Sequence, residues 1–378
     1  LGTGPETVIL TYPQYRSIEL NLNSKEWNFL PQDIRNVYLN YLLTIGILGL
    51  ITYIVLIVLT VKTATQKSVL IFGISVTFFA LGLSNIFYNL GVFNHVFFWI
   101  LIGVVVNQTA NQKIVLNSIK ALRVLALGSI FFSILMLVLL VVAIVAEVNF
   151  AKGLTLFNSI SVVQRQRSVF IETQAQNILA IDNTFTKDDE KRALQAIHYT
   201  QSAARLNPVN QVYQRQLITV LAMYGNIKKQ NNQPKEALKA YEQALDKARQ
   251  LINNNPYDFL NYNLVSAIGL QAIRFNLSID DLAQITLESA QKAAKLHPTS
   301  PIVINNLGEV YWQMKDLRNA EKTFREAVNL KADNVQSLTH LADVLVDEEE
   351  KQEALVIYKD IFKLNNEEGI KEKIRNLE

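Results

Sequence analysis

The sequence predicts an all-α protein in two parts: a partial, multi-span bundle of transmembrane helices, followed by a soluble α-solenoid. Three observations lead to this prediction. The first 148 residues are strongly apolar, whereas the rest has an ordinary content of Lys, Glu, Gln and Asn. Four apolar tracts divide the first part, separated by short polar breaks. In the second part, small and apolar residues recur after 34 residues, which is typical of stacked helix pairs.

The overall composition excludes some classes of function. The net charge of +3 is spread over both parts of the 378-residue chain and gives no reason to expect a nucleic-acid partner. Cysteine is absent, which excludes disulfides and thiolate metal ligands. Because the chain begins at Leu1 with what reads as the interior of a protein, we expect it to be the C-terminal part of a longer one.

The four apolar tracts differ in length. A helix needs roughly 20 apolar residues to cross about 30 Å of hydrocarbon. Tracts 38–61, 68–90 and 120–148 are long enough. Tract 92–106 is shorter and follows its predecessor after a short turn, so we expect a tight helical hairpin, or else a re-entrant element. These tracts define a membrane region at 37–148.

Basic residues near the membrane ends predict the orientation. Two short loops between the tracts carry five of them: Lys62, Lys67, Lys113, Lys120 and Arg123. If both loops are cytoplasmic, residues 1–36 and the tail 149–378 lie on the outer side. Arg35 and Lys152 oppose this assignment, five against two.

The tail contains an internal repeat. When residues 301–334 are aligned with the next 34 residues, small and apolar residues occupy the same positions in both segments. Leu307, Ala320, Phe324 and Leu330 align with Leu341, Ala354, Tyr358 and Leu364. This pattern, with Leu-Gly-x-x-Tyr at 307–311, resembles the tetratricopeptide repeat. "KEALKAYEQALDKARQL" and, more weakly, "SAARLNP" resemble further units, and a helix pair is expected to end at Leu296, before His297 and Pro298.

We therefore predict a tetratricopeptide repeat domain at 149–378, with two clear repeats and three degenerate ones. Such helix pairs cannot bury their apolar faces alone, so they stack into a superhelix with a concave groove. A groove of this kind favours binding of a partner peptide or a neighbouring subunit. We interpret His198, His297 and His340 as structural or solvated residues rather than ligands.

Residues 1–36 form a polar segment on the predicted outer side. Arginine binds phosphate and carboxylate with a bidentate fork, so Arg16 and Arg35 suit an anionic lipid head group. The alternative is that they lie among lipid phosphates or pair with Glu19 and Asp33. No cluster of metal ligands is visible in the sequence, and we expect neither a metal nor a cofactor.

Two motifs carry a resemblance to a known family. "GTGPETVILTYPQYR" is followed about twenty residues later by "RNVYLNYLLTIGILGLITYI", and this resembles the last large external loop and next helix of the O-antigen ligase and polymerase family. "SNIFYNLGVFNHVFFWILIGVVV" is similar to the family's following helix pair. The resemblance covers roughly residues 1 to 110, and many bacterial members also end in tetratricopeptide repeats.

The resemblance implies a function in polysaccharide biosynthesis. It implies a glycosyltransferase of the bacterial cytoplasmic membrane that moves an oligosaccharide from an undecaprenyl-diphosphate carrier to an acceptor on the outer face. On this basis Arg35, Arg16 and Glu6 are candidate catalytic residues. Arg16, Arg35, Asn36 and Tyr15 are candidate substrate-binding residues. The bilayer, the lipid-linked glycan and a protein in the repeat groove are the expected partners.

One position departs from the family pattern. The family's proposed catalytic His falls on Arg35, which cannot act as a general base at physiological pH. Either Arg35 holds the diphosphate while a carboxylate such as Glu6, Glu19 or Asp33 takes the base role, or transfer activity has been lost. In the second case the chain is a non-catalytic, membrane-anchored scaffold for cell-envelope assembly. If transfer activity is retained, the reaction is ligation, polymerisation or protein O-glycosylation.

Overall fold

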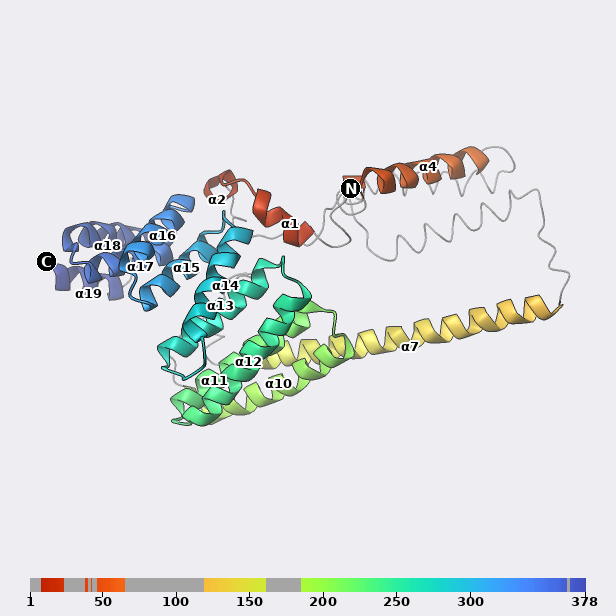
Figure 1. Ribbon diagram of the computed structural model, residues 1–378, viewed down its shortest axis with the longest axis horizontal. Coiled ribbons are helices and arrows are strands. Elements are labelled where there is room, and N and C mark those ends of the chain that lie inside the picture. Colours follow the sequence, from red (N-terminus) through yellow and green to blue (C-terminus); the bar gives the residue numbers. More distant parts are fainter. Residues whose placement is uncertain are drawn as a thin grey trace. The chain divides into compact units, whose positions relative to one another are not determined.

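A computed structural model describes most of the solenoid and parts of the apolar region, namely residues 8–23, 38–39, 42, 46–64, 119–160, 185–365 and 368–378. Every regular element in these ranges is an α-helix (Figure 1). The chain divides into two compact units, one made of residues 1–12 and 30–133, the other of residues 13–29 and 134–378. The all-α prediction is thus confirmed for the described residues.

The first unit contains α4 (Ile47–Ala64), which lies largely within the predicted span 38–61. Its composition is almost wholly apolar, and side chains such as Leu48, Ile51 and Val58 are exposed. The predicted spans 68–90 and 92–106 lie outside the described residues.

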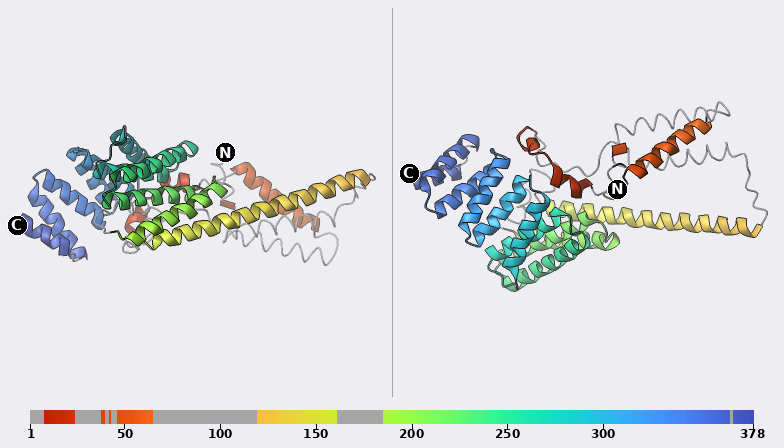
Figure 2. Two further views of the ribbon diagram at one scale, coloured as in Figure 1. Left: turned by 90° about the horizontal axis from the view of Figure 1, so that it is seen from below. Right: turned by 45° about the horizontal axis from the view of Figure 1, so that its top comes forward.

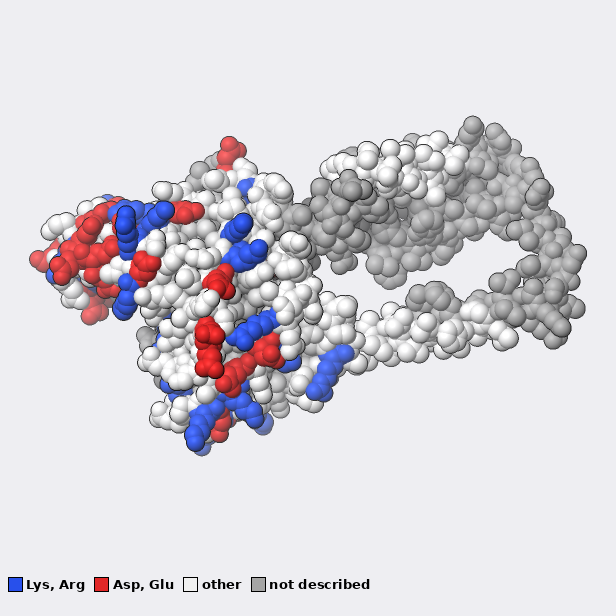
Figure 3. Space-filling view, viewed as in Figure 1, with Lys and Arg blue, Asp and Glu red and all other residues white. Residues whose placement is uncertain are grey.

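A single long helix, α7 (Ile119–Asn158), runs into the solenoid (Figure 1). It contains the predicted span 120–148 and continues ten residues beyond the predicted domain boundary without a break. Within the described residues, one stretch, Leu137–Asn158, is long and apolar enough to cross a membrane. Residues 124–146 of α7 carry no charged side chain, and the described side chains of this part are white in Figure 3.

Ten further helices form the solenoid: α10 (Lys187–Leu206), α11 (Gln211–Gln230), α12 (Pro234–Asn254), α13 (Phe259–Arg274), α14 (Leu282–Leu296), α15 (Pro301–Gln313), α16 (Leu317–Leu330), α17 (Val335–Asp347), α18 (Lys351–Asn365) and α19 (Glu368–Leu377). They stack in chain order, as Figures 1 and 2 show. The predicted helix end at Leu296 is confirmed.

The helices form antiparallel pairs, in which we call the first helix A and the second B. A short turn joins each pair to the next, and the last side chain of that turn caps the following A helix. Asn210, Asp258, Ser300 and Asn334 each accept a hydrogen bond from a backbone N–H in the first turn of α11, α13, α15 and α17. Such caps satisfy donors that have no partner inside the helix.

A small residue at one position of each A helix lets the B helix approach closely. A Cβ atom on Gly225 would lie 2.6 Å from the ring of Tyr241, and one on Gly308 would lie 2.6 Å from the ring of Phe324. Gly153 of α7 would contact Thr200 of α10 at the same 2.6 Å. The C-terminal end of α7 is therefore the A helix of the first pair, with α10 as its B helix. The described residues contain five such pairs, and α19 caps the last.

Candidate protein-binding site on the inner face

The A helices line the inner face of the solenoid. Consecutive A helices α11, α13, α15 and α17 contact one another directly, and each also packs against its own B helix. Because the A helices are close together, the stack curves towards them. This is the concave side that a tetratricopeptide superhelix offers to a partner.

Polar side chains join the A helices across this face. Arg215 of α11 donates to the carboxylate of Asp258, the N-cap of α13, at 2.7 Å, and both side chains are buried. One helix further along, Asn306 of α15 donates to Asn263 of α13 at 2.9 Å. These contacts hold neighbouring repeats in register, since each needs its partner's position to within a fraction of an ångström.

The densest polar group on this face surrounds Glu309, which is 2% exposed. Its carboxylate accepts a hydrogen bond from Arg274 of α13 at 2.8 Å and one from Asn305 at 3.1 Å. His340 of α17 places its Nδ1 atom 3.3 Å from the same carboxylate. We call these four side chains the Glu309 cluster, and it ties together α13, α15 and α17.

The solvent-accessible part of the inner face lies on α17. In α13 and α15 most side chains are buried and none is fully exposed. The buried ones include Gln271, whose amide has no hydrogen-bond partner within the described part of the chain. On α17 the side chains of Leu341 and Leu345 fill the contact with α18, and the opposite side carries Thr339, which is partly exposed. A partner would therefore meet α17 and its end first.

The end of α17 combines aromatic and acidic groups. Trp312 donates its indole N–H to Asp347 at 2.7 Å and packs against the ring of His340. Asp343 accepts hydrogen bonds from Tyr358 and Lys373. Burial and the negative charge of Asp343 raise the pKa of Tyr358 well above its ordinary value, so this hydroxyl remains a donor. Large aromatic side chains such as Trp312 are enriched at protein interfaces.

Arg16, a candidate catalytic residue, lies against the solenoid rather than in an open site. Its side chain is 5% exposed and donates to Asn21 at 2.5 Å. Asn21, in the short helix α2 (Glu19–Asn23), in turn donates to the backbone carbonyl of Thr299 at 2.9 Å. Lys331 donates to the carbonyl of Asn21 at 3.3 Å. The segment after Tyr15 is thus seated on the turns that precede α15 and α17.

His297 lies beneath this contact. It is 2% exposed and packs edge-on against Phe259. Burial, and secondarily the nearby charge of Arg16, lowers the pKa of His297 to about 3, so the imidazole is neutral in the folded protein. This agrees with the prediction that His297 is structural. His198 is exposed, and His340 belongs to the Glu309 cluster.

The other candidate residues divide into two groups. Tyr15 is 84% exposed at the end of α1 (Val8–Tyr15). Glu6, Arg35 and Asn36 lie outside the described residues. Among the described residues, no group of three His, Cys, Asp or Glu side chains is placed to hold a metal ion.

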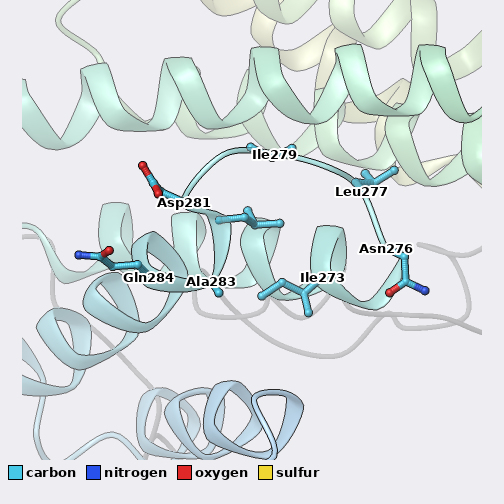
Figure 4. Close-up of a pocket in the computed structure, with 8 residues that line it drawn as sticks. Ile273, Asn276, Leu277, Ile279, Asp281, Ala283 and Gln284 are labelled. Atoms are coloured by element: carbon cyan, nitrogen blue, oxygen red, sulfur yellow. The ribbon is translucent and has the colours of Figure 1, made fainter.

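One cavity of about 520 Å³ opens where the third pair departs from the usual short turn (Figure 4). The connection 275–281 between α13 and α14 is longer than those of the neighbouring pairs, and Asn276 and Asp281 both adopt positive φ in it. Figure 4 shows Leu277 and Ile279 on this connection, above Ile273 of α13, and all three line the cavity. Its few polar groups do not converge, so we assign no ligand to it.

Comparison with known families identifies the helix pairs. The tetratricopeptide repeat family model matches residues 218–249 and 303–334, which fall on the pairs α11–α12 and α15–α16. The chain therefore carries tetratricopeptide repeats, a fold suited to protein–protein interaction, as the sequence predicted. No match to the O-antigen ligase family accompanies them. Among curated proteins, none matches the chain.

Several solved repeat proteins are similar in structure. The chain resembles MamA (41-end) from Desulfovibrio magneticus RS-1, with 16% identity and a TM-score of 0.37 over 51% of this chain and 96% of that one. It also resembles TTC0263, a thermophilic TPR protein in Thermus thermophilus, with 16% identity and a TM-score of 0.37 over 50% of this chain and 91% of that one. YrrB, described as a TPR protein with an unusual peptide-binding site, has 13% identity and a TM-score of 0.32 over 55% of this chain and 92% of that one.

Sequence reasoning did not find the Glu309 cluster. Glu309 falls inside the quoted Leu-Gly-x-x-Tyr motif, and His340 was considered only as an isolated residue. Their meeting could have been inferred from the repeat alignment, because the residue 34 positions before His340 is Asn306, which lies one helical turn before Glu309 on the neighbouring A helix. Arg274 could not have been placed this way, since the long connection 275–281 breaks the 34-residue spacing between its repeat and the next.

Proposed function

We propose that the chain is a membrane-anchored scaffold that holds a protein partner on the inner face of its tetratricopeptide repeats. The observation that carries this proposal is the continuity of α7, whose exposed apolar stretch runs directly into the A helix of the first pair. A helix that is apolar all round and exposed in water would be unfavourable, whereas lipid accommodates it. The repeat domain is thereby fixed to the membrane without a flexible linker.

The partner is expected at the accessible inner face on α17. A photo-crosslinking amino acid placed at Thr339 in the full-length protein, in cells, should give adducts with a protein partner. The matched control is Asn329, an exposed residue on the B helix α16. Adducts of equal yield at both positions, or from Asn329 alone, would contradict an inner-face site.

We also propose where the chain is located. The distribution of Lys and Arg supports a multi-pass protein of the bacterial cytoplasmic membrane with its repeat domain on the extracytoplasmic side. Since the chain has no cysteine, Lys235→Cys introduces a single reactive thiol on exposed α12. A membrane-impermeant maleimide should label it in intact spheroplasts. Labelling only after lysis would place the repeats in the cytoplasm instead.

A second candidate function is transfer of an undecaprenyl-diphosphate-linked glycan, by ligation or polymerisation. Its support is the family resemblance of residues 1 to 110, with Arg16, Arg35, Asn36 and Tyr15 as substrate-binding residues and Glu6 as a carboxylate near the reacting hydroxyl. Arginines at the membrane surface would neutralise the diphosphate leaving group. The buried position of Arg16 against Asn21 gives it a structural partner as well, so Arg35 is the more informative residue to change.

Release of undecaprenyl diphosphate distinguishes the two functions. Membranes with the full-length protein and a lipid-linked oligosaccharide should release it if the chain is a transferase, and Arg35→Ala should abolish that release. A scaffold releases none, yet keeps its Thr339 crosslinks in the Arg35→Ala variant. Release that is unaffected by Arg35→Ala would contradict the role assigned to this residue.

A further inference from the structure

The first A helix and the second run side by side and in the same direction. Glu147 of α7 accepts a hydrogen bond from the hydroxyl of Tyr213, the third residue of α11, and Phe150 stacks on the same ring at 4.6 Å. Further along, Phe157 of α7 packs with Val220 and Met223 of α11. The start of α11 is therefore level with Glu147, and the residues of α7 before Glu147 project beyond that edge of the solenoid.

The same edge carries the turns between repeats. Each A helix after α7 begins directly after one of these turns. The salt bridge from Arg215 to Asp258 places the turn before α13 beside the N-terminal part of α11. The first turn spans 207–210 and the second 255–258. Both turns lie at the end of the solenoid from which the apolar part of α7 emerges.

Exposed apolar side chains gather on these two turns. Among the residues that the structure describes from Phe185 onward, seven large apolar side chains are exposed, namely Leu194, Leu206, Val209, Val212, Tyr257, Val356 and Leu364. Four of the seven belong to the first two turns or their flanks. Val209 is 86% exposed and Tyr257 67%, the two highest values in the set. Single exposed apolar residues are ordinary, but their concentration on one edge calls for a partner.

The two turns carry no exposed carboxylate, which fits contact with an anionic lipid surface. The turns contain Asn and Pro beside Val209 and Tyr257, and their carboxylate, Asp258, is buried and paired with Arg215. Arg205, just before the first turn, is exposed and would meet lipid phosphates. Tyrosine is enriched at membrane interfaces because its ring is apolar and its hydroxyl stays hydrated.

We infer that the edge formed by the turns 207–210 and 255–258 lies on the bilayer surface, with Val209 and Tyr257 inserted at the level of the lipid head groups. This rests on the proposed anchoring of α7. The bilayer surface is then near Glu147, where α7 leaves the lipid and begins to pack against α11. The repeat domain lies on the membrane by an edge, and its orientation is fixed by two contacts rather than one.

Single-cysteine variants of the cysteine-free chain test this inference. The 378-residue chain carrying Val209→Cys, Tyr257→Cys, Lys235→Cys or Leu139→Cys is labelled with a polarity-sensitive fluorophore and reconstituted into vesicles of phosphatidylethanolamine and phosphatidylglycerol. Nitroxide-labelled lipids then report proximity by quenching. All four side chains are exposed, so labelling leaves the solenoid core intact. Lys235 lies beyond the far end of α11, roughly 30 Å from Val209 for a helix rising about 1.5 Å per residue.

We expect strong quenching and a blue-shifted emission at Leu139, intermediate quenching at Val209 and Tyr257, and none at Lys235. If Leu139 is quenched but Val209 and Tyr257 are quenched no more than Lys235, the edge contact is overturned and the anchoring stands. Absence of quenching at Leu139 would overturn the anchoring and the edge contact together.

Discussion

Replacing Gly308 by Ala tests the close approach of A and B helices from which the repeat assignment is argued. The new Cβ would lie 2.6, 2.7 and 3.0 Å from three ring carbons of Phe324, and that ring is wholly buried. Overpacking of this kind costs about 1–3 kcal/mol. The better helix propensity of Ala returns about 1 kcal/mol. Because the Phe324 ring has nowhere to move, we expect a net loss of about 1–2 kcal/mol in the local stability of α15 and α16.

Gly369 is the matched control. It lies exposed in α19, and a Cβ there would meet no atom within 4 Å. Gly369→Ala should therefore be neutral or stabilise α19 by up to about 1 kcal/mol. Because repeat arrays do not unfold in one step, local stability is best measured by hydrogen exchange of the amides in each helix. If both substitutions shift stability in the same direction, steric crowding by Phe324 is not why residue 308 is glycine.

Three further predictions concern buried polar groups. Glu309→Ala leaves the partly buried guanidinium of Arg274 without its carboxylate and should destabilise the centre of the solenoid by about 3 kcal/mol, measured by amide hydrogen exchange in α13 and α15, whereas Glu326→Ala at an exposed position of α16 should cost almost nothing. The pKa of His297 is lowered to about 3 in the folded protein, so the contribution of this residue to folding stability is complete above about pH 6.5 and is lost as pH falls towards 3, by up to about 1.4 kcal/mol per pH unit. His297→Leu should therefore flatten the fall in melting temperature between neutral pH and about pH 5. An unchanged slope would contradict a neutral His297. Tyr213→Phe removes the hydrogen bond to Glu147 and should cost about 1 kcal/mol, seen as faster amide exchange where α7 packs on α11 but not in α18.

The repeats could be predicted because their determinants are local. In residues 301–334 the small Gly308, the aromatic Phe324 and the closing Leu330 stand at fixed spacings, and the spacing alone defines a helix pair. The same logic fails for α7 and α10. Their crossing glycine and its neighbour, Gly153 and Thr200, are separated by a long insertion, so the sequence gives no periodic signal although the packing is the same.

The candidate residues illustrate the other limit of sequence reasoning. The sequence makes Arg16 a candidate because a guanidinium near a membrane suits an anionic head group, an argument that uses the residue type and not its neighbours. Its partner Asn21 and the carbonyl of Thr299 are 278 residues apart, and no local pattern relates them. Burial of a charged side chain is decided by such distant contacts, so it had to come from the structure.

Hydropathy alone could not locate where α7 leaves the membrane, because a membrane helix and a core helix are equally apolar. By hydropathy the candidate span runs to Asn158, yet Ala146 and Phe157 are fully or almost fully buried in the solenoid core, where protein and not lipid covers them. From Leu137 to Val141 every consecutive side chain is exposed, on all sides of the helix. Such an apolar surface needs lipid or a second helix to cover it. The change of environment therefore falls between Val141 and Ala146. Glu147, which accepts a hydrogen bond from Tyr213, is the first charged side chain after this change of environment. One continuous helix thus serves first as an anchor and then as the first A helix of the repeats.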